Sequence, residues 1–452
     1  MSPLFLTTMS LIILYQNTIY VSSASEKLSC CLEKESDFSI IFLGDNIMSN
    51  NKYKLTEGIY WVGAIDYELK VFDIIMETEF GSTYNSYLVI GSEKTALIET
   101  AKVQFKDEFL NRIKEHVKIK DIDYLVMNHT EPDHSGSIKY LLEENPDLEI
   151  YGSAAALMNL KEILNITFKG HRVTNGLSVS LGDKTLDFYL QPNLHWPDTM
   201  FTHVKEADTL FTCDFFGAHY ASNIIKVNDL PDLKIYERVL KEYFDAIMHP
   251  FLPYVRKGLE RVKDLNPKII AVSHGAVLEE PYLSHAIELY DKWSTLPVKL
   301  DKPLVLIPYA TAYGYTEKMA NIISDTLKEE FSGEIYVNMY DLIYADRHEI
   351  VKQVPICDAF LVGSSTILRD TVKIVWDLLA SIDYEMAKGK LASSFGSYGW
   401  SGEAVEHIIQ REKQLQFKTV EGLRIKFSPS ESQIEEIKEY ARGIARLIKD
   451  NK

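Results

Sequence analysis

The chain has 452 residues, of which 46% are hydrophobic and 25% are charged, so it is long enough to bury the cores of two or three globular domains. Its formal net charge of −17 excludes a nucleic acid as the main partner, because binding to a phosphate backbone relies on clustered Lys and Arg. The four cysteines form no C-x-x-C pair, which excludes a local iron–sulfur or rubredoxin-type site and fits a reducing compartment.

The first 47 residues differ in composition from the rest of the chain. Leu4 to Tyr15 is apolar and the small residues of 21–25 follow it, so this segment resembles a signal peptide without a basic n-region. It is too short and interrupted for a transmembrane span, and we expect no membrane partner. Met48 opens the stretch MSNNKYKLTEGIYWVG, a natural start for a domain. We therefore interpret residues 1–47 as a leader or extension, and a targeting segment is the alternative.

Residues 48–298 are predicted to form a first α/β domain. The helical stretches KDEFLNRIKEHVK and SGSIKYLLEE repeat apolar residues every three to four positions. STLPVKLDKP, residues 294–303, contains two prolines and no period, so we place a linker there. The clearest predicted strands, each ending in a polar loop, are YLVIGSEKTALIET (87–100), DIDYLVMN (121–128), KTLDFYLQP (184–192), DTLFTCDFF (208–216) and PKIIAVSH (267–274).

Residues 299–452 are predicted to form a second α/β domain. PLVLIPYATAYGYTEKMANIISDTLKEE has the pattern of a strand, a loop of small residues and an amphipathic helix. Further strand-and-loop units follow at DAFLVGSSTIL and KLASSFGSYGWSG. This alternation is typical of a doubly wound parallel sheet.

The stretch NHTEPDHSGS, residues 128–137, places four potential metal ligands within six positions directly after a predicted strand. Side chains two residues apart on an extended exit project to one side, so His129, Glu131 and Asp133 can converge. His134 joins them if the loop turns. Three more candidates stand at the ends of other predicted strands, where ligands of α/β sheets gather, namely His195, Asp214 and His274.

Each of these residues also has a simpler interpretation. A single histidine after a strand is usually an ordinary loop residue, and a single aspartate there usually caps a helix or forms a turn. Seven nitrogen and oxygen ligands organised around one dense motif fit a binuclear metal site better than a set of turns. We therefore predict a binuclear site built from His129, Glu131, Asp133, His134, His195, Asp214 and His274.

Three loops of the second domain carry a predicted cofactor site. A hydroxyl-rich loop, Thr311 to Thr316, precedes a helix whose amides can bind phosphate, but it lacks a Walker lysine and a G-x-G-x-x-G pattern. GSSTILRD and FGSYGWSGEA follow two later strands, and the second of these offers aromatic faces for a flat ring. Any one of these loops could be a plain glycine-rich turn. The predicted cofactor residues are Thr311, Ala312, Tyr313, Gly314, Tyr315, Thr316, Ser364, Ser365, Thr366, Ile367, Leu368, Ser397, Tyr398, Gly399 and Trp400.

Together these motifs resemble those of the flavodiiron proteins, also called A-type flavoproteins. That family joins a metallo-β-lactamase-like αββα sandwich to a flavodoxin-like doubly wound parallel sheet. The resemblance covers residues 48–452 and rests on His-x-Glu-x-Asp-His, on the eighteen residues between His195 and Asp214, and on three loops in flavodoxin order. It implies FMN in the loops and two iron ions in the binuclear site. One iron would be held by His129, Glu131 and His195, the other by Asp133, His134 and His274, and Asp214 would bridge them.

The choice of metal depends on Glu131. Zinc hydrolases of this fold use His-x-His-x-Asp-His, so a glutamate in place of the second histidine adds an anionic oxygen, and three carboxylates then face two metals. The added charge and harder ligands favour ferric states, and hence redox chemistry over hydrolysis. The flavin loops depart from the flavodoxin pattern at three positions: Tyr315 replaces an Asn, Ser365 a Pro and Leu368 an Asn.

A further histidine near the metal motif is His219, in an FG-x-H pattern after Asp214 that resembles the family. We expect it to orient ligands or to donate a hydrogen bond to a bound diatomic molecule, and we count it with Glu131 and Asp214 as a catalytic residue. Tyr84, His171 and His203 are expected to be packing residues.

These observations predict a cytoplasmic oxidoreductase in which a separate donor reduces FMN and FMN reduces the diiron site. Two electrons on the flavin and two on the irons suit reduction of O2 to water or of NO to N2O. The donor would be a rubredoxin, an NAD(P)H-dependent reductase or a reduced deazaflavin, and the resemblance implies a head-to-tail homodimer or homotetramer. A zinc-loaded hydrolase with a flavodoxin docking domain and a non-enzymatic electron carrier remain the alternatives.

Overall fold

The computed structural model describes residues 10–15, 18–23, 53–74, 76–296 and 298–451. Most of the predicted leader, residues 1–47, therefore lies outside the described residues. Its described parts are two antiparallel strands, β1 (Ser10–Tyr15) and β2 (Thr18–Ser23).

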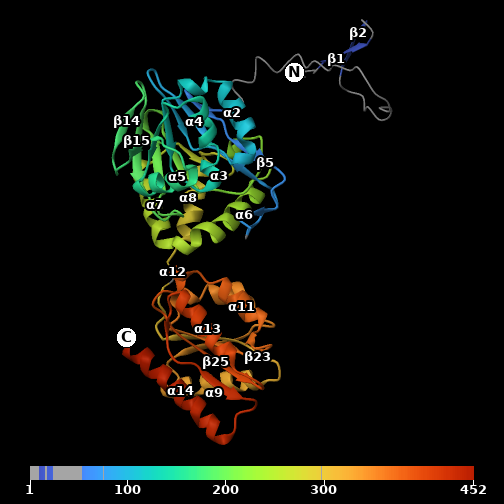
Figure 1. Ribbon diagram of the computed structural model, residues 1–452, viewed down its shortest axis with the longest axis vertical. Coiled ribbons are helices and arrows are strands. Elements are labelled where there is room, and N and C mark those ends of the chain that lie inside the picture. The colour runs from blue at the N-terminus through green and yellow to red at the C-terminus, as the bar shows by residue number, and fades with distance from the viewer. Residues whose placement is uncertain (1–9, 16–17, 24–52, 75, 297, 452) are drawn as a thin grey trace, which may run out of the picture. The chain divides into compact units, whose positions relative to one another are not determined.

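The chain divides into two compact units, each with its own sheets (Figure 1). The first extends to Lys241 and also contains Leu265–His285, while the second contains Glu242–Asp264 and the chain from Ala286 onward. The predicted domain boundary at residue 298 stays a prediction. No helix in the described ranges combines the length and the apolar character that crossing a bilayer requires.

Two large sheets form the first unit. One has the order β13-β12-β11-β10-β9-β4-β3, and the other has the order β14-β15-β16-β17-β18-β19. The strands of the first sheet are β3 (Lys54–Thr56), β4 (Ile59–Trp61), β9 (Tyr87–Ile90), β10 (Thr95–Ile98), β11 (Tyr124–Met127), β12 (Glu149–Gly152) and β13 (Lys169–Arg172). Those of the second are β14 (Ser178–Ser180), β15 (Thr185–Leu190), β16 (Met200–Val204), β17 (Thr209–Cys213), β18 (Ile269–Val272) and β19 (Leu278–Glu279).

Smaller elements complete this part of the chain. Two short antiparallel pairs are β5 (Ala64–Asp66) with β8 (Ser82–Tyr84), and β6 (Val71–Phe72) with β7 (Met76–Glu77). The helices of the first unit are α2 (Lys106–Lys114), α3 (Pro132–Ser135), α4 (Ile138–Glu144), α5 (Ala154–Leu164) and most of α6 (Leu233–Tyr243). The next two helices, α7 (Leu252–Leu265) and α8 (Tyr282–Trp293), belong mainly to the second unit. The 3-10 turns of the first unit span Val103–Phe105, Ile119–Asp121, Lys205–Ala207 and Val227–Asp229, while a π-helical turn, Phe244–Met248, and a 3-10 turn, His249–Phe251, belong to the second unit.

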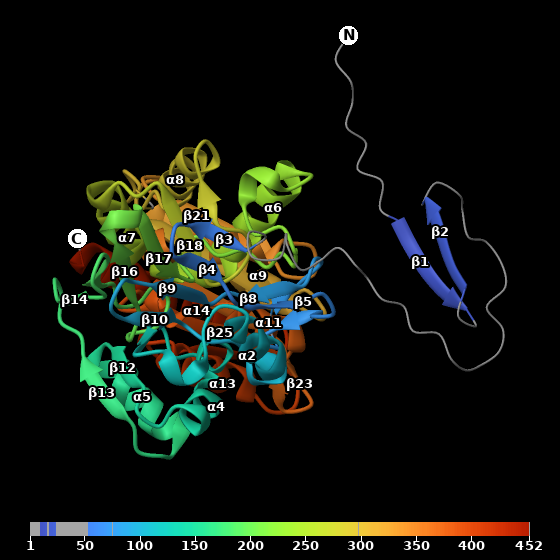
Figure 2. The ribbon, with the colours of Figure 1, turned by 90° about the horizontal axis from the view of Figure 1, so that it is seen from above.

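The strand β10 shows how the layers of the first unit are built. All four of its side chains are buried, as expected for a strand covered on both faces. Leu97 belongs to the core shared with α2, α4 and α5, which cover the outer face of the first sheet (Figure 2). Ala96 and Ile98 point the other way, into the core between the two sheets, where Phe188 and Phe211 of the second sheet meet them. The period of two along the strand thus serves two separate cores.

The second unit is built on a parallel sheet with the order β21-β20-β22-β25-β26, in which β27 also pairs with β25. Its strands are β20 (Leu304–Ala310), β21 (Tyr336–Asp341), β22 (Ala359–Ser364), β25 (Leu391–Tyr398), β26 (Lys418–Thr419) and β27 (Leu423–Lys426), with a short hairpin of β23 (Thr366–Ile367) and β24 (Asp370–Thr371). Its helices are α9 (Tyr315–Glu330), α10 (Arg347–Val351), α11 (Lys373–Ala380), α12 (Tyr384–Ala387), α13 (Glu403–Gln414) and α14 (Glu431–Asp450), and Val354–Ile356 form a 3-10 turn.

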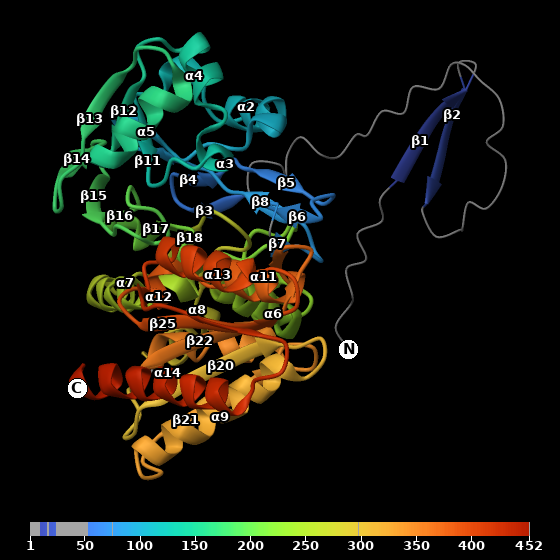
Figure 3. The same cartoon turned by 60° about the horizontal axis from the view of Figure 1, so that its bottom comes forward.

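Helices cover both faces of this parallel sheet, as Figure 3 shows. One core contains residues of α9 and α14, and the other contains residues of α11 and α13. The chain order reverses at β20, because the next strand in sequence lies on one side of it and β22 lies on the other. Such a reversal leaves a crevice at the carboxyl ends of the strands, which is where ligands bind in doubly wound sheets.

Candidate metal centre and cofactor loops

The dense ligand motif follows the buried strand β11 and folds into a single helical turn, α3. Glu131 stands at the N-cap position without a capping hydrogen bond from its side chain, and Pro132 stands at the first helical position, where the missing amide hydrogen costs nothing. The Ser135 hydroxyl donates to the carbonyls of Thr130 (2.9 Å) and Glu131 (3.1 Å), which closes the turn. The turn that His134 needs is therefore made locally by the sequence.

The other three candidates come from the second sheet. Asp214 follows β17 directly, His274 lies two residues after β18, and His195 lies in the loop between β15 and β16. Since β17 and β18 are parallel neighbours, their carboxyl ends deliver Asp214 and His274 to the same edge. The predicted convergence at strand ends is what the structure shows.

Four of the predicted ligands form a first cluster, in which the ligand atoms all lie within 4.8 Å of one another: His129, Glu131, His195 and Asp214. The Nε2 atoms of His129 and His195 are 3.1 and 3.2 Å from Oε2 of Glu131. They are 3.6 and 3.5 Å from Oδ2 of Asp214. Two ligand atoms bound to one ion at about 2.1 Å are roughly 3.0–3.4 Å apart, so this spacing fits a single metal ion.

The remaining predicted ligands form a second cluster of Asp133, His134 and His274, again within 4.8 Å. Nε2 of His274 is 3.2 Å from Oδ2 of Asp133, and Nε2 of His134 is 3.4 Å from Oδ1 of that residue. The other oxygen of Asp214, Oδ1, faces this cluster at 3.3 Å from His134 and 3.4 Å from His274. One carboxylate thus presents one oxygen to each cluster, which is the arrangement of a bridging ligand.

Several atoms of these clusters are buried without a hydrogen-bond partner among the described residues. They are both carboxylate oxygens of Asp133, both of Asp214, and Nε2 of His134. Buried charged oxygens without partners are costly, and coordination of a cation removes that cost. The donor set therefore fits two metal ions.

The charges of the clusters balance each other in the metal-free chain. Burial works to lower the pKa of His129, but its hydrogen bonds to Asp198 and Glu131 outweigh burial and raise that pKa to about 10. Burial works to raise the pKa of Asp214, but His134 and His195 hold it well below the usual range. A protonated His129 thus carries positive charge where a metal ion would, and metal binding would displace the proton on its Nε2.

Two carboxylates that the sequence analysis missed hold the far nitrogens of the histidines. Both oxygens of Asp198 lie 3.2 Å from Nδ1 of His129, and Oε2 of Glu99 lies 3.2 Å from Nδ1 of His134. Asp198 is fully buried, and its Oδ2 also accepts from the amide (2.8 Å) and hydroxyl (2.7 Å) of Thr130. The sequence gives only their positions as a signal, since Asp198 lies three residues after His195 and Glu99 lies at the end of a predicted strand.

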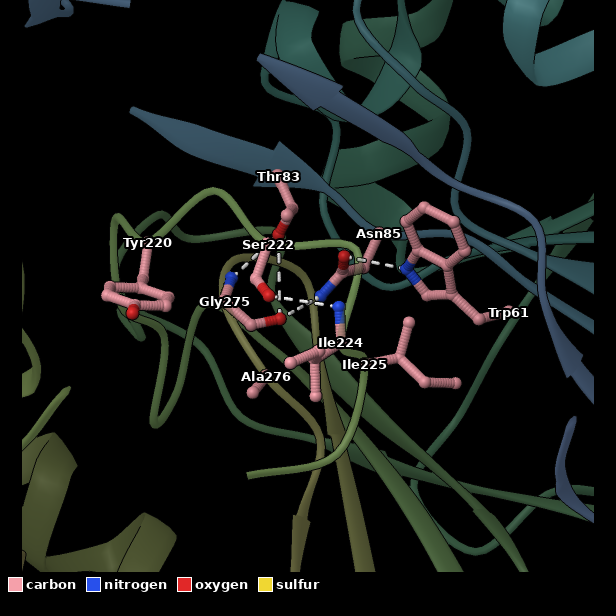
Figure 4. Close-up of a pocket in the computed structure, with 9 residues that line it drawn as sticks. All are labelled: Trp61, Thr83, Asn85, Tyr220, Ser222, Ile224, Ile225, Gly275 and Ala276. Atoms are coloured by element: carbon pink, nitrogen blue, oxygen red, sulfur yellow. Dashed lines mark hydrogen bonds between the residues drawn. The ribbon is translucent and has the colours of Figure 1, made fainter. Parts of the chain in front are cut away.

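A further group clamps the turn that carries His274 (Figure 4). The amide nitrogen of Asn85 donates to the carbonyls of Val272 and Gly275, both at 2.8 Å, while its oxygen accepts from the Trp61 indole at 2.8 Å. Gly275 has φ +82°, which a side chain rarely adopts. Thr83 accepts from Nδ1 of His274 at 2.7 Å through its carbonyl. The orientation of His274 is therefore set by β8 and the residues that follow it.

His219 lies beside the second cluster. Its ring centroid is 4.2 Å from that of Phe72 and 5.3 Å from that of His274, and Nδ1 is 2.9 Å from the Ser82 hydroxyl. Burial, and then the charge of His274, hold the pKa of His219 well below its usual range, so the ring is neutral.

The other aromatic candidates lie outside the clusters of potential metal ligands found in the described residues. Tyr84 is buried in the first core, with its ring 5.9 Å from that of His274. His171 stacks on Tyr151 at the exposed edge strand β13, and His203 is buried on β16.

The three predicted cofactor loops follow β20, β22 and β25, three adjacent parallel strands. Gly314, with φ +78°, caps α9 at the end of the first loop. The hydroxyl oxygen of Thr311 in that loop is buried without a hydrogen-bond partner among the described residues, as a phosphate-binding group would be. Tyr313, Leu368 and Trp400 are 86%, 87% and 79% exposed, so all three loops present apolar surface.

Comparisons with known proteins agree with both units. Residues 83–275 match the ODP family beta lactamase, and residues 307–440 match the flavodoxin family. The chain is 39% identical over 401 residues to the flavo-diiron protein FprA2 of Clostridium acetobutylicum. The matched region covers 87% of this chain and 99% of the relative. The chain belongs to the flavodiiron family. The predicted fold, a metallo-β-lactamase-like sandwich followed by a flavodoxin-like sheet, is confirmed.

Two further relatives of this flavodiiron protein bear on its chemistry. It is 34% identical over 402 residues to the nitric oxide reductase of Moorella thermoacetica, with 88% of this chain and 98% of the relative covered. Its structure is similar to that of rubredoxin oxygen:oxidoreductase from Desulfovibrio gigas, with a TM-score of 0.61 and 28% identity, covering 88% of this chain and 98% of the other. The flavodiiron protein is thus an oxidoreductase, as predicted, of a family that reduces nitric oxide or oxygen. The family implies FMN and a diiron centre.

Proposed function

We propose that this flavodiiron protein passes electrons from an external donor through FMN to a diiron centre that reduces O2 to water, NO to N2O, or both. The observation that carries the proposal is the pair of clusters joined by Asp214, with Glu131 in the position that distinguishes a redox site from a zinc hydrolase. The names of the relatives from Moorella thermoacetica and Desulfovibrio gigas support both substrates.

In this proposal the seven clustered residues hold two irons, which supply electrons and open positions for a small molecule. His129, Glu131 and His195 would hold one iron and Asp133, His134 and His274 the other, with Asp214 between them. Three carboxylates facing two metals favour the higher oxidation state. Asp198 and Glu99 would fix the ring orientation of one histidine in each set.

We assign His219 a positioning role at the second iron. Its neutral ring, bonded to Ser82 through Nδ1, lies against His274 and Phe72. In the tautomer in which Nδ1 accepts from the Ser82 hydroxyl, the ring proton is on Nε2, and this neutral imidazole can donate a hydrogen bond to a bound diatomic molecule without adding positive charge to the site. The Phe72 ring, packed on both histidines, excludes water from that side.

The flavin loops would hold FMN, with its phosphate at the start of α9 and its ring near Tyr398 and Trp400. The exposed Tyr313, Leu368 and Trp400 support a second copy packed head to tail over this edge, as a homodimer or homotetramer. The donor would be a separate rubredoxin, an NAD(P)H-dependent reductase or a reduced deazaflavin, because the chain has no C-x-x-C motif. The free, buried Cys213 and Cys357 fit the cytoplasm as the compartment.

Two measurements test the proposal: the metal and flavin content of the purified chain, and the single-turnover oxidation of the reduced protein by each gas. We expect two irons and one FMN per chain, and oxidation of the fully reduced protein by O2, NO or both in an anaerobic stopped-flow experiment. Two zinc ions per chain with esterase or lactamase turnover, and no oxidation by either gas, would replace the proposal by a hydrolase. If a Glu131→Ala variant kept full gas reduction, the gas would not be reduced at these clusters, and the chain would be a plain electron carrier.

A further inference from the structure

A third group of potential ligands faces the far nitrogen of His134. It consists of Glu99, His134 and Cys213, all of them buried, and its ligand atoms lie within 4.8 Å of one another. Sγ of Cys213 is 3.8 Å and Oε2 of Glu99 is 3.2 Å from Nδ1 of His134. An ion held at about 2.3 Å from sulfur and about 2.1 Å from nitrogen and oxygen keeps its ligand atoms roughly 3.3–3.7 Å apart. The three side chains therefore have the spacing of a metal site.

The backbone of Cys213 departs from regular strand geometry. Cys213 ends β17 at a point where the pairing with β18 shifts register, and its φ of +55° lies in the left-handed region. A bulge of this kind re-aims a side chain, and a strained residue other than glycine is typical of functional sites. A free, buried cysteine is usually a small apolar residue, but the sulfur of Cys213 contacts an imidazole nitrogen.

Glu99 has one oxygen with hydrogen-bond partners and one without. Its Oε1 accepts from the amides of Asn128 and His129, whereas Oε2 is buried and makes no hydrogen bond of good geometry within the described ranges. A buried charged oxygen without a partner is costly. The Glu99 carboxylate and a Cys213 thiolate together neutralise one divalent cation. Sulfur makes this group softer than the seven nitrogen and oxygen ligands of the binuclear site, so it favours a thiophilic ion such as Zn2+ or Cd2+ over Fe2+.

The ring of His134 has a carboxylate next to each of its nitrogens. Nε2 is 3.4 Å from Oδ1 of Asp133 and 3.3 Å from Oδ1 of Asp214, while Nδ1 is 3.2 Å from Oε2 of Glu99. A neutral imidazole has one nitrogen free to bind a metal, and the other nitrogen carries the proton. Whichever nitrogen binds a metal, the remaining N–H has a carboxylate beside it. The neutral ring can therefore serve either group, but only one at a time.

We propose that Glu99, His134 and Cys213 form a site for a thiophilic divalent cation, which competes with the second iron for His134. On binding, the cation takes Sγ, Oε2 and Nδ1, the thiol proton leaves to solvent, and the ring keeps a proton on Nε2. The second cluster then lacks its His134 ligand. This inference rests on the proposed function, because it takes the second cluster as an iron site. It adds that an ion bound beside the diiron centre removes one ligand from it.

The test adds Cd2+ to the full-length chain already loaded with two Co2+ ions. Every chain carries Cys30→Ser and Cys31→Ser, so that Cys213 and Cys357 are its only thiols. Ultraviolet absorption detects Cd2+–thiolate bonds, and metal analysis after filtration counts the Co2+ released. We expect a thiolate band that corresponds to one Cd2+ per chain, with release of one Co2+ in step with it. Cys213→Ser should abolish the band and raise the Cd2+ concentration needed for release at least about tenfold.

The matched control is Cys357→Ser, because Cys357 is also free and buried but follows the 3-10 turn Val354–Ile356 in the second unit. It should keep both the band and the release. A full thiolate band without loss of Co2+ would overturn the competition. Equal bands or equal release with and without Cys213→Ser would overturn the site. A parent chain that does not hold two Co2+ before Cd2+ is added would count against the binuclear centre itself, so the two failures are distinguishable.

Discussion

Asp198→Asn should weaken one metal site and spare the other. The Asp198 carboxylate is fully buried, lies 3.2 Å from Nδ1 of His129 and accepts two hydrogen bonds from Thr130. Asparagine keeps the shape but removes the charge. It also replaces an acceptor oxygen by an NH2 group, which cannot accept from the imidazole. Nε2 of His129 would then be a poorer metal ligand, because a carboxylate at Nδ1 fixes the ring orientation and raises the basicity of Nε2, and asparagine does neither as well.

The magnitude follows from the role of such partners. Loss of a group that orients a metal-bound histidine costs about ten- to a hundredfold in metal affinity. Each tenfold corresponds to about 1.4 kcal/mol. The effect should be confined to the first cluster, because Nε2 of His129 faces Glu131, whereas the second cluster has its own carboxylate in Glu99.

The assay is a titration of the metal-free chain with Co2+, followed by visible absorption. Wild type should bind two ions, and Asp198→Asn should shift one of the two binding steps by one to two decades in concentration. Asp147→Asn is the matched control, since Asp147 is 89% exposed and pairs with Lys169 at the surface. If Asp198→Asn left both steps within twofold of wild type, or shifted both equally, the reasoning would be refuted.

Three more predictions concern the same site. Glu131→His restores the histidine of the zinc hydrolases and should replace iron by zinc while lowering O2 or NO turnover at least about tenfold, which metal analysis and stopped-flow rates check. Asn85→Leu removes three buried hydrogen bonds and should lower the free energy of unfolding by about 3 kcal/mol in urea denaturation; a loss below about 1 kcal/mol would contradict the clamp. The pKa of His129 is raised from 6.5 to about 10, so its stabilising contribution is complete below pH 6.5 and is lost as pH rises through 10. The melting temperature of the metal-free chain should therefore fall from pH 7 to 10, and fall less with metal bound; equal slopes would count against this.

Much of the site could be predicted because its residues follow strands. The sequence analysis placed His129, Asp214 and His274 at strand ends, and the parallel pairing of β17 with β18 brings Asp214 and His274 together whatever the loops do. The turn at His134 could also be predicted, because Pro132 favours the start of a helix. Residue spacing and strand periodicity were enough for these positions.

The supporting residues could not be predicted in the same way. Asp198 contacts a histidine 69 residues away, and Asn85 reaches a carbonyl 187 residues away. Their contacts depend on how the two sheets face each other, and a single carboxylate or amide in a loop is usually a cap or a turn residue. Ser365 was assigned to the flavin site, but its contact with the first loop depends on the pairing of β20 with β22.

The spread of the ligands along the chain has a consequence for how the protein is made. The seven residues run from His129 to His274, so no nascent segment that ends before His274 holds a complete binuclear site. The two sheets must face each other before the Asp214 carboxylate can serve both clusters. Metal ions would therefore be selected by a finished sandwich whose geometry is already set, after the ribosome has passed this region.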